Sequence, residues 1–206
     1  MFRLHGFYTQ HTCKALYVLA ALDEDFEFVF TDLSTGVQRS PEFLAMNPAG
    51  KAPVLEHDGK YLFESGAICR YAANVTGSDL YPSDPYERAL VDQWLDYFVC
   101  HPGRWLTSLY FQNVIKPRVG MGDPDPDTIK EATEFATQQL QLVDDHLANN
   151  GYLANNRLSI ADLAAYAYVE QESDLEFSIA AYPNVVKWYE RLGASDPIVR
   201  GKARLQ

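Results

Sequence analysis

The chain has 206 residues, of which 47% are hydrophobic, and it carries a formal net charge of −11 at pH 7. A chain of this length and composition can bury the core of one large domain or of two small ones. Because nucleic-acid binding depends on clustered Lys and Arg, the acidic excess argues against a nucleic-acid partner.

The N-terminal third of the sequence alternates between strand and helix patterns. We predict a strand over Phe2–His5, a helix over Cys13–Leu22 and a second strand over Phe26–Phe30. The apolar run 15–22 inside the predicted helix is too short to span a bilayer. We therefore expect a strand-helix-strand unit and no membrane partner.

The stretch 41–71 combines three signals. Residues 47–50 are a cluster of helix breakers, and 58–59 is an Asp-Gly pair typical of a hairpin turn. Pro53 enters the first strand of that hairpin, and 64–66 (Glu-Ser-Gly) opens an apolar helix. A proline at a strand entry, a hairpin and a helix start bearing a carboxylate and a hydroxyl suit a short peptide-like ligand. An ordinary strand-turn-strand-helix connection without a ligand is the alternative.

The order of elements predicts the fold class. A βαβ unit followed by a ββα unit is typical of a thioredoxin-like α/β domain, which we predict over residues 1–76. This domain contains no Cys-x-x-Cys, so it lacks the usual equipment for dithiol redox chemistry. A segment rich in Gly and Pro over 77–86 indicates a linker, and the remainder, 87–206, predicts an all-α C-terminal helical domain.

The strongest folding signal in the helical half is Ser159-Ile160-Ala161-Asp162. Ser159 can accept a bond from the amide of Asp162, while the Asp162 carboxylate returns one to the Ser159 amide. The helix that follows, 164–169, is apolar on nearly every face, which predicts that it lies in the core. We interpret the motif as structural.

Cysteine and histidine usage indicates a reducing compartment and no metal. Three cysteines at wide spacing do not suggest a disulfide framework, and the five histidines lack metal-ligand spacing. We therefore expect a cytoplasmic protein without a bound metal. The residues concerned are Cys13, Cys69, Cys100, His5, His11, His57, His101 and His146.

An all-helical domain with a buried helix capped by Ser-x-x-Asp, placed behind PEFLAMNPAGKAPVL and LFESGAICRY, resembles the cytosolic glutathione S-transferase family. The resemblance covers essentially the whole chain and points to the phi, theta and bacterial nu-like branches. It implies an enzyme that activates the thiol of its co-substrate glutathione for conjugation to a hydrophobic electrophile, or for peroxide reduction. It also implies detoxification and a homodimer, with Tyr97 and Phe98 on the helix that family dimers use.

The resemblance assigns a set of glutathione contacts. In the family the proline at Pro53 is cis, and the backbone of Ala52 pairs with the cysteinyl unit of the ligand. The acid at Glu64 suits the ligand ammonium, whereas the Ser65 hydroxyl and the amides at the helix start suit its α-carboxylate. The contacts expected for the glycyl carboxylate are Lys51 together with Gln38 or Arg39.

Catalysis in the family requires a group that stabilises the glutathione thiolate just before the first helix. The stretch here is Tyr8-Thr9-Gln10-His11-Thr12-Cys13, and different family registers select different residues. We prefer Thr12, and we keep Thr9, Gln10 and Cys13 as alternatives. A tyrosine-type activator at Tyr8 lies at the wrong distance from the predicted helix.

The second substrate is expected to lie against the helical domain. Aromatic side chains there could contact a hydrophobic electrophile, although each could equally be a core residue. The candidates are Trp105, Tyr110, Phe111 and Tyr166.

Two other functions remain open at this stage. One is a glutathione-dependent thiol reductase that uses Cys13 as a nucleophile, because a cysteine at a helix start can have a lowered pKa. The other is a non-catalytic regulatory or scaffold protein of the same fold, which need not keep the pair Glu64 and Ser65.

Overall fold

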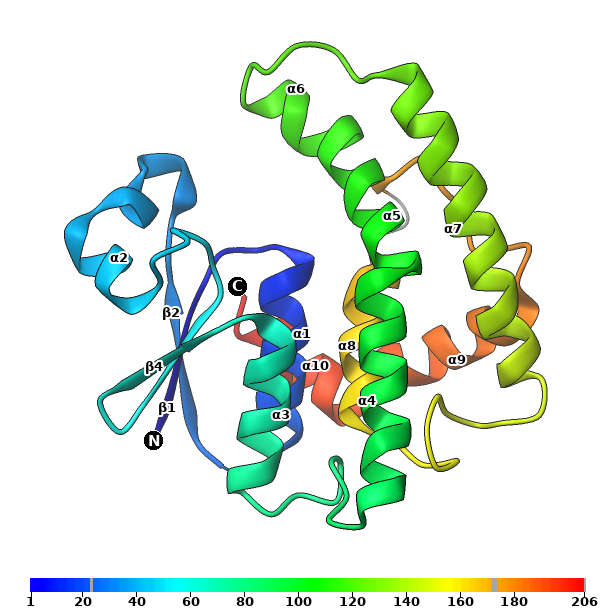
Figure 1. The fold of residues 1–206 in the computed structure, drawn as a ribbon, viewed down its shortest axis with the longest axis horizontal. Helices are drawn as coiled ribbons and strands as arrows, with labels where there is room; N and C mark the ends of the chain where they lie inside the picture. The colour runs from blue at the N-terminus through cyan, green and yellow to red at the C-terminus, as the bar shows by residue number, and fades with distance from the viewer. Residues whose placement is uncertain (23, 172–173, 206) are drawn as a thin grey trace. The chain divides into compact units, whose positions relative to one another are not determined.

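The computed structural model describes residues 1–22, 24–171 and 174–205, and these fall into two compact units (Figure 1). Unit 1 consists of Met1–Pro82 together with the segment from Ala194 onward. Unit 2 consists of Ser83–Gly193.

Unit 1 contains a four-stranded sheet whose strands follow the order β2-β1-β3-β4. Strand β1 pairs in parallel with β2 and antiparallel with β3, and β3 forms an antiparallel hairpin with β4. This mixed sheet, with a helix over Gln10–Ala21 between its first two strands and another over Ser65–Val75 after the last, confirms the predicted thioredoxin-like fold. The strands are β1 (Phe2–Gly6), β2 (Phe26–Phe30), β3 (Val54–His57) and β4 (Lys60–Phe63).

Helices α1 and α3 pack against each other beside this sheet. Alternate residues of β1, Phe2, Leu4 and Gly6, are buried, as expected for one covered face of a sheet. Gly6 is required because a Cβ there would lie 2.4 Å from Cγ2 of Thr12 on α1. The helical segments of this part of unit 1 are α1 (Gln10–Ala21), the 3₁₀ turns η1 (Leu33–Thr35) and η2 (Val37–Arg39), α2 (Pro41–Met46) and α3 (Ser65–Val75).

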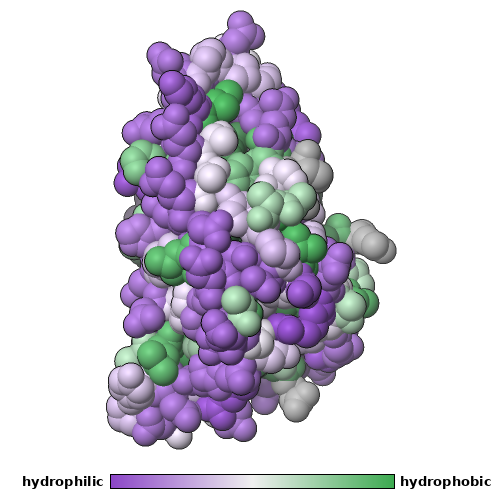
Figure 2. All heavy atoms as spheres, turned by 90° about the vertical axis from the view of Figure 1, so that its right-hand side faces the viewer, coloured by the Kyte–Doolittle hydropathy of each residue, from purple (hydrophilic) through white to green (hydrophobic). Residues whose placement is uncertain are grey.

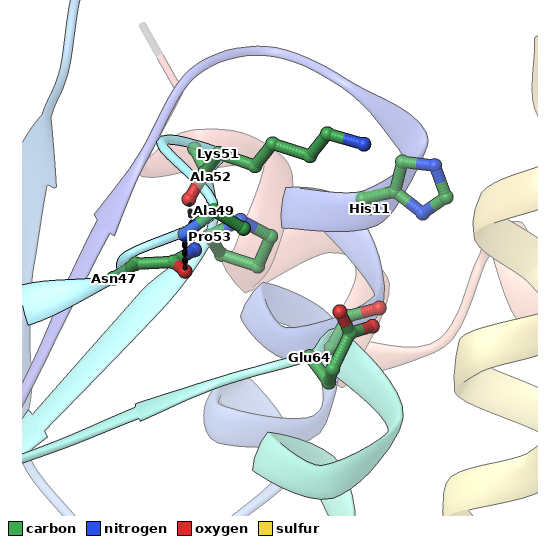
Figure 3. Close-up of a pocket in the computed structure, with 8 residues that line it drawn as sticks. His11, Asn47, Ala49, Lys51, Ala52, Pro53 and Glu64 are labelled. Carbon is green, nitrogen blue, oxygen red and sulfur yellow. Dashed lines mark hydrogen bonds between the residues drawn. The ribbon is translucent and has the colours of Figure 1, made fainter. Parts of the chain in front are cut away.

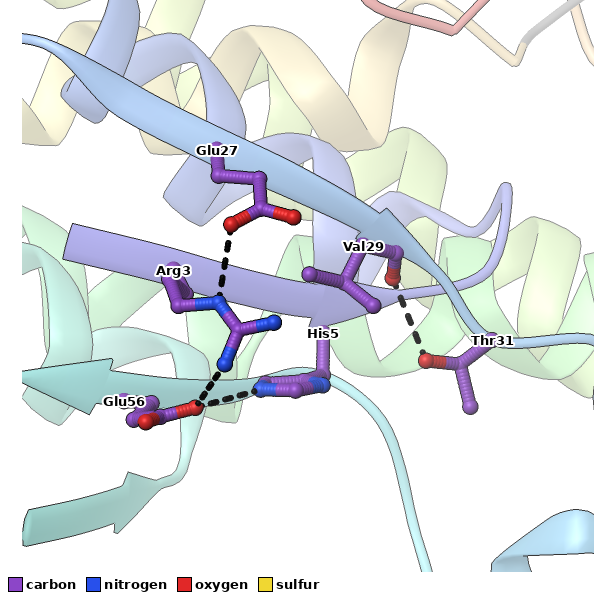
Figure 4. A network of polar contacts seen from close by, with 6 residues as sticks. All are labelled: Arg3, His5, Glu27, Val29, Thr31 and Glu56. Carbon is purple, nitrogen blue, oxygen red and sulfur yellow. Dashed lines mark hydrogen bonds and ion pairs between the residues drawn. The ribbon is translucent and has the colours of Figure 1, made fainter. Parts of the chain in front are cut away.

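The other face of the sheet carries a charged cluster that joins three strands (Figure 4). Arg3 on β1 donates from Nε to Glu27 Oε2 at 2.8 Å and from Nη1 to Glu56 Oε2 at 3.0 Å. His5 Nε2 lies 3.2 Å from the same Glu56 oxygen. Because the register places Arg3 opposite both acids, the alternation of the strand by itself produces the cluster. Exposed pairs of this kind contribute little to stability.

Helix α10 (Asp196–Ala203) belongs to unit 1, although the sequence analysis assigned these residues to the helical domain. It packs on α1, and the approach is close because a Cβ at Gly201 would lie 2.5 Å from Cδ1 of Tyr17. Ile198 is fully buried in the same helix. Helical periodicity alone does not tell which unit a terminal helix covers, so the pattern could not reveal this contact.

Unit 2 is all helical. Its longest helix, α7, turns an apolar stripe inward, with Ala132, Ala136 and Leu140 fully buried. Figure 2 shows the side of the molecule that bears α7 and α9, where hydrophilic residues dominate and hydrophobic ones are scattered. None of the described helices is both long and apolar enough to cross a bilayer. The elements are α4 (Pro85–Cys100), α5 (Pro102–Tyr110), the π-helical turn η3 (Phe111–Ile115), α6 (Lys116–Arg118), α7 (Pro126–Leu147), α8 (Ile160–Val169) and α9 (Pro183–Gly193).

The predicted capping box is confirmed at the start of α8. Asp162 Oδ2 accepts bonds from the Ser159 amide at 3.0 Å and from the Ser159 hydroxyl at 2.9 Å. Its Oδ1 accepts from the Leu153 amide at 2.9 Å and from Trp188 Nε1 at 3.0 Å. Burial raises the pKa of Asp162, and these four hydrogen bonds oppose the rise. The motif therefore fixes the core of unit 2.

Candidate functional site

Unit 1 contains a cavity of about 220 Å³ where three segments of the chain meet (Figure 3). The first turn of α1, the loop that enters β3 and the start of α3 each contribute side chains. We call it the N-terminal cavity. Its lining residues are His11, Asn47, Ala49, Lys51, Ala52, Pro53, Glu64 and Ser65. Four predicted ligand residues, Lys51, Ala52, Glu64 and Ser65, are thus brought together with Pro53.

The loop that enters β3 is held by a buried asparagine. Asn47 Nδ2 donates to the Lys51 carbonyl at 2.7 Å, and its Oδ1 accepts from the Ala49 amide at 3.0 Å. These two hydrogen bonds fix the backbone just before the Ala52–Pro53 peptide. That peptide bond is cis, as the resemblance implied. The sequence analysis treated Asn47 only as a helix breaker, so its role in shaping the cavity wall was missed.

Glu64 has a backbone conformation that non-glycine residues seldom adopt, with φ at 70°. It stands at the N-cap of α3, and its own side chain does not bond to the helix start. Glu64 lines the cavity, and Ser65 begins the helix beside it. Unusual φ angles of this kind cluster at ligand sites, where the strain is part of the function.

The thiolate-stabilising residues predicted from sequence are placed differently from the expectation. Helix α1 begins at Gln10, not at Cys13, so Thr12 lies inside the first turn instead of before the helix. Thr12 and Cys13 are completely buried, and Gln10 is 4% exposed. None of the three lines the cavity. The structure therefore does not favour Thr12, Gln10 or Cys13 as a contact of the ligand sulfur.

Thr9 is the N-cap of α1 and keeps part of its side chain accessible. Its Oγ1 accepts from the Thr12 amide at 3.4 Å and lies 3.4 Å from the Thr12 hydroxyl. Among the four named alternatives, Thr9 is the one that combines a hydroxyl with accessible surface, although it does not line the N-terminal cavity. Tyr8 is 49% exposed and lies outside that lining as well.

His11 lines the cavity, although the sequence analysis considered it only as a possible metal ligand. Burial, followed by the positive charges of Lys14 and Lys51, lowers the pKa of His11 to about 4. The imidazole is therefore neutral at physiological pH. Its position two residues after the helix cap is the signal that could have identified it.

Lys14 lies on α1 in contact with α3, where the Cys69 thiol meets its carbonyl, and is only 3% exposed. Burial lowers its pKa to about 8, while the charges of Cys69 and Glu64 act in the opposite direction. The thiol of Cys69 donates to the Lys14 carbonyl at 3.6 Å, and burial raises the pKa of that thiol to about 12. Lys14 therefore adds a partly ionised buried amine to the electrostatics of the cavity.

Two of the predicted ligand residues lie next to the cavity and not in its lining. Gln38 and Arg39 belong to η2, and the backbone of Gln38 contacts the loop at Gly50, where a Cβ would lie 2.9 Å from the Gln38 carbonyl. Arg39 is exposed. Among the residues that the structure describes, no group of three or more His, Cys, Asp or Glu side chains could hold a metal ion.

The aromatic candidates for the second substrate do not gather at one place in unit 2. Tyr166 is 1% exposed and stacks on Tyr189, with ring centroids 4.9 Å apart, so it is a core residue. Tyr110 is 8% exposed, and Trp105 stacks on Phe135 of α7 at 4.7 Å. Phe111 remains, with 37% of its surface accessible.

Comparison with known proteins places the chain in a family. Residues 2–74 match the glutathione S-transferase N-terminal domain, and residues 106–196 match the C-terminal domain. Glutathione S-transferase 3 of Zea mays is 35% identical over 176 residues, which is 82% of this chain and 78% of that protein. Glutathione S-transferase F10 of Arabidopsis thaliana is 39% identical over 161 residues, 76% and 74% of the two chains.

Solved structures agree with these relatives. Glutathione transferase F7 from Populus trichocarpa has a TM-score of 0.89 at 28% identity, with 100% of both chains covered. A glutathione S-transferase I bound with lactoylglutathione has a TM-score of 0.89 at 29% identity, with 98% of this chain and 99% of that chain covered. Plant phi-class and bacterial transferases are thus among its relatives, and the chain belongs to the glutathione S-transferase family as a glutathione transferase.

Proposed function

We propose that this transferase binds glutathione in the N-terminal cavity and activates the thiol with the hydroxyl of Thr9. The observation that carries the proposal is the convergence of Lys51, the Ala52–Pro53 peptide and the Glu64–Ser65 helix start on one cavity. These groups come from segments up to 14 residues apart, and the fold places them around a space suited to a small peptide.

The charges of the cavity match those of glutathione, which carries one ammonium and two carboxylates. Glu64 binds the ammonium of the γ-glutamyl unit, and Ser65 with the first amides of α3 binds the α-carboxylate. Lys51 meets the glycyl carboxylate from the loop before β3. The backbone of Ala52 pairs with the cysteinyl unit, which places the sulfur toward the start of α1.

Thr9 activates the thiol because an N-cap hydroxyl and the positive end of a helix both favour an anion. A free thiol ionises near pH 8.5, so lowering its pKa increases the fraction of reactive thiolate. The thiolate attacks an electrophilic carbon of the second substrate, the carbon–sulfur bond forms, and the leaving group departs with its electron pair. With a peroxide, the thiolate sulfur attacks one oxygen, the O–O bond breaks and the alcohol leaves. A second glutathione then converts the resulting sulfenic acid to glutathione disulfide and water.

The test compares three variants in one assay. Thr9→Val removes the hydroxyl, so we expect the thiol pKa of bound glutathione to rise. The turnover should fall by the equivalent of about 1.5–3 kcal/mol in activation free energy. Thr9→Ser keeps both the hydroxyl and the helix cap, so it should act like the parent. Thr12→Val removes the buried hydroxyl that lies 3.4 Å from Thr9 Oγ1, so it separates the role of Thr12 from that of Thr9. If Thr12→Val lost activity and Thr9→Val did not, Thr12 would regain the role.

The reductase alternative has no support from the geometry, because Cys13 is completely buried in α1. The cysteines described in the structure are all free thiols. We propose a cytoplasmic, detoxifying enzyme on that basis and on the family membership. A scaffold protein would bind immobilised glutathione without conjugating it to electrophiles, so a conjugation panel separates the two functions.

For the second substrate and the assembly we make two further proposals. Phe111 contacts the hydrophobic electrophile, because it is the most exposed of the four predicted aromatics. The native protein is a homodimer, so sedimentation should give twice the 23.3 kDa of the chain at micromolar concentration. Phe98 is only 2% exposed within unit 2, so it is a core residue and not a dimer contact.

A further inference from the structure

We propose that the imidazole of His11 donates a hydrogen bond to the sulfur of bound glutathione and so stabilises the thiolate together with the Thr9 hydroxyl. This inference rests on the proposed glutathione site. It adds to that site a side chain with its own donor, from the first turn of α1.

The position of His11 supports this role. Of the residues in the first turn of α1, Gln10 and Thr12 are buried, whereas His11 lines the cavity. Ala52, whose backbone pairs with the cysteinyl unit, lines the same cavity from the opposite segment. Figure 3 shows His11 at the start of α1, on the same cavity as Ala52. In the proposed binding mode the sulfur is directed to the start of α1, where His11 lies.

The protonation state of His11 suits a donor. A neutral imidazole offers one N–H donor and one acceptor nitrogen. It can therefore donate a hydrogen bond to the sulfur without carrying a charge. The charged groups around it are Lys14 on the same helix, Lys51 on the loop before β3 and Glu64 at the start of α3. Burial and the two lysines keep the ring neutral at physiological pH, with a pKa of about 4.

The same surroundings favour an anion next to the ring. Burial disfavours any charge, cationic or anionic, and would by itself raise the pKa of a thiol. The two lysines, in contrast, disfavour only a cation, and their potential lowers the pKa of a thiol at the same place. The positive potential of the two lysines, together with the N–H donor of the ring, thus offsets part of the desolvation that the cavity imposes on the sulfur.

Three variants at position 11 test the donor directly. His11→Leu removes it, whereas His11→Asn and His11→Gln place an amide N–H near the position of Nδ1 or Nε2. We expect His11→Leu to raise the thiol pKa of bound glutathione by about one unit, measured by thiolate absorbance. One of the two amide variants should restore most of the shift. His101→Leu, at an exposed histidine of unit 2, is the control and should change nothing.

Binding of S-methylglutathione separates the donor from a role in cavity shape. Its sulfur cannot ionise, so His11→Leu should leave its affinity within about twofold of the parent. A thiol titration curve in His11→Leu that coincides with the parent's would overturn the proposal. So would an equal loss of affinity for glutathione and for S-methylglutathione.

A reciprocal measurement uses the histidine itself. If the neutral ring donates to the sulfur, ionisation of the thiol must change the environment of the ring N–H. The ring resonances of His11, followed by nuclear magnetic resonance, should therefore shift with the thiol titration of bound glutathione and stay unchanged over the same pH range with S-methylglutathione. Resonances that do not follow the thiol titration contradict the inference. Failure of the parent protein to bind glutathione at all would instead reject the proposed function.

Discussion

The two units differ in how their functional residues are specified. In unit 1 the candidate ligand residues belong to short motifs, and the structure brings Lys51, Ala52 and Glu64 to one cavity. In unit 2 the aromatic candidates do not form one accessible site, because Tyr166 and Tyr110 are buried in the core. A site built on a strand entry and a helix start is set by local geometry. A hydrophobic site depends on which aromatic faces the packing leaves exposed, which is a property of the whole unit.

The largest expected effect concerns the capping box of Ser159 and Asp162 in unit 2, which we interpret as structural. Asp162→Ala leaves four buried donors without their acceptor, and we expect a loss of about 3–5 kcal/mol in the free energy of unfolding. Chemical denaturation followed by tryptophan fluorescence measures it, since Trp188 is one of the four donors.

The exposed Asp145, which bonds to Gln141 at 2.9 Å, provides the control, and Asp145→Ala should be nearly neutral. Asp162→Asn keeps one carbonyl oxygen and should lose less stability than Asp162→Ala. Equal stability of Asp162→Ala and the parent would show that the capping box does not hold the core.

The next effect tests the ligand motif in unit 1. Glu64→Gln keeps the shape of the side chain and removes the charge opposite the ligand ammonium. We expect glutathione affinity to fall by about 1–3 kcal/mol, with little change in the free energy of unfolding. Calorimetric titration provides the measurement. Glu42→Gln, at an exposed acid in the first turn of α2, should bind like the parent. Unchanged affinity in Glu64→Gln would remove Glu64 from the site.

The sequence predicted the fold because its signals are local and mutually consistent. The breakers at 47–50, the turn at Asp58-Gly59 and the helix opening at 64–66 each act within a few residues, and the register of the sheet follows from them. The capping box at Ser159 and Asp162 is equally local.

The residues that the sequence could not place depend on a helix boundary or on contacts far along the chain. The start of α1 differs from the prediction because Thr9 caps it, and this difference moves Thr12 from the expected site into the interior. The same earlier start of α1 places His11 in the first turn of the helix, where it lines the cavity. The contact of Gly201 with Tyr17 spans most of the chain, and no periodicity encodes it. Boundaries of this kind are the least certain part of any pattern.

A smaller effect sharpens the comparison within unit 2. If Trp105 is a packing residue, Trp105→Leu loses its stacking on Phe135 and about 1–2 kcal/mol of stability, while the KM for an electrophile stays the same. Phe111→Ser should raise the KM by a larger factor than Trp105→Leu does, because 37% of the surface of Phe111 is accessible to a ligand. Steady-state kinetics beside thermal unfolding distinguishes the two. A raised KM in Trp105→Leu would return Trp105 to the substrate site.

The smallest effect links the cavity of unit 1 to its core through Lys14. Its folded pKa of about 8 lies below the ordinary value of 10.5, so between these values the unfolded chain holds a proton that the folded chain has released. Stability must then rise with pH in this window and fall as pH drops through 8. Between pH 8 and 9 the gain is about 1 kcal/mol. Cys69 opposes it above its ordinary pKa of 9.0, because the folded thiol keeps its proton to about pH 12.

The comparison of the parent with Lys14→Met isolates this contribution, because Cys69 titrates in both proteins. The difference in the free energy of unfolding, parent minus variant, should increase by about 1 kcal/mol from pH 8 to pH 9. At pH 7 the variant should be at least as stable as the parent, since it no longer buries an ammonium group. A difference that is flat across this range would mean that the buried amine keeps its ordinary pKa, and Lys14 would then contribute a full positive charge beneath Glu64.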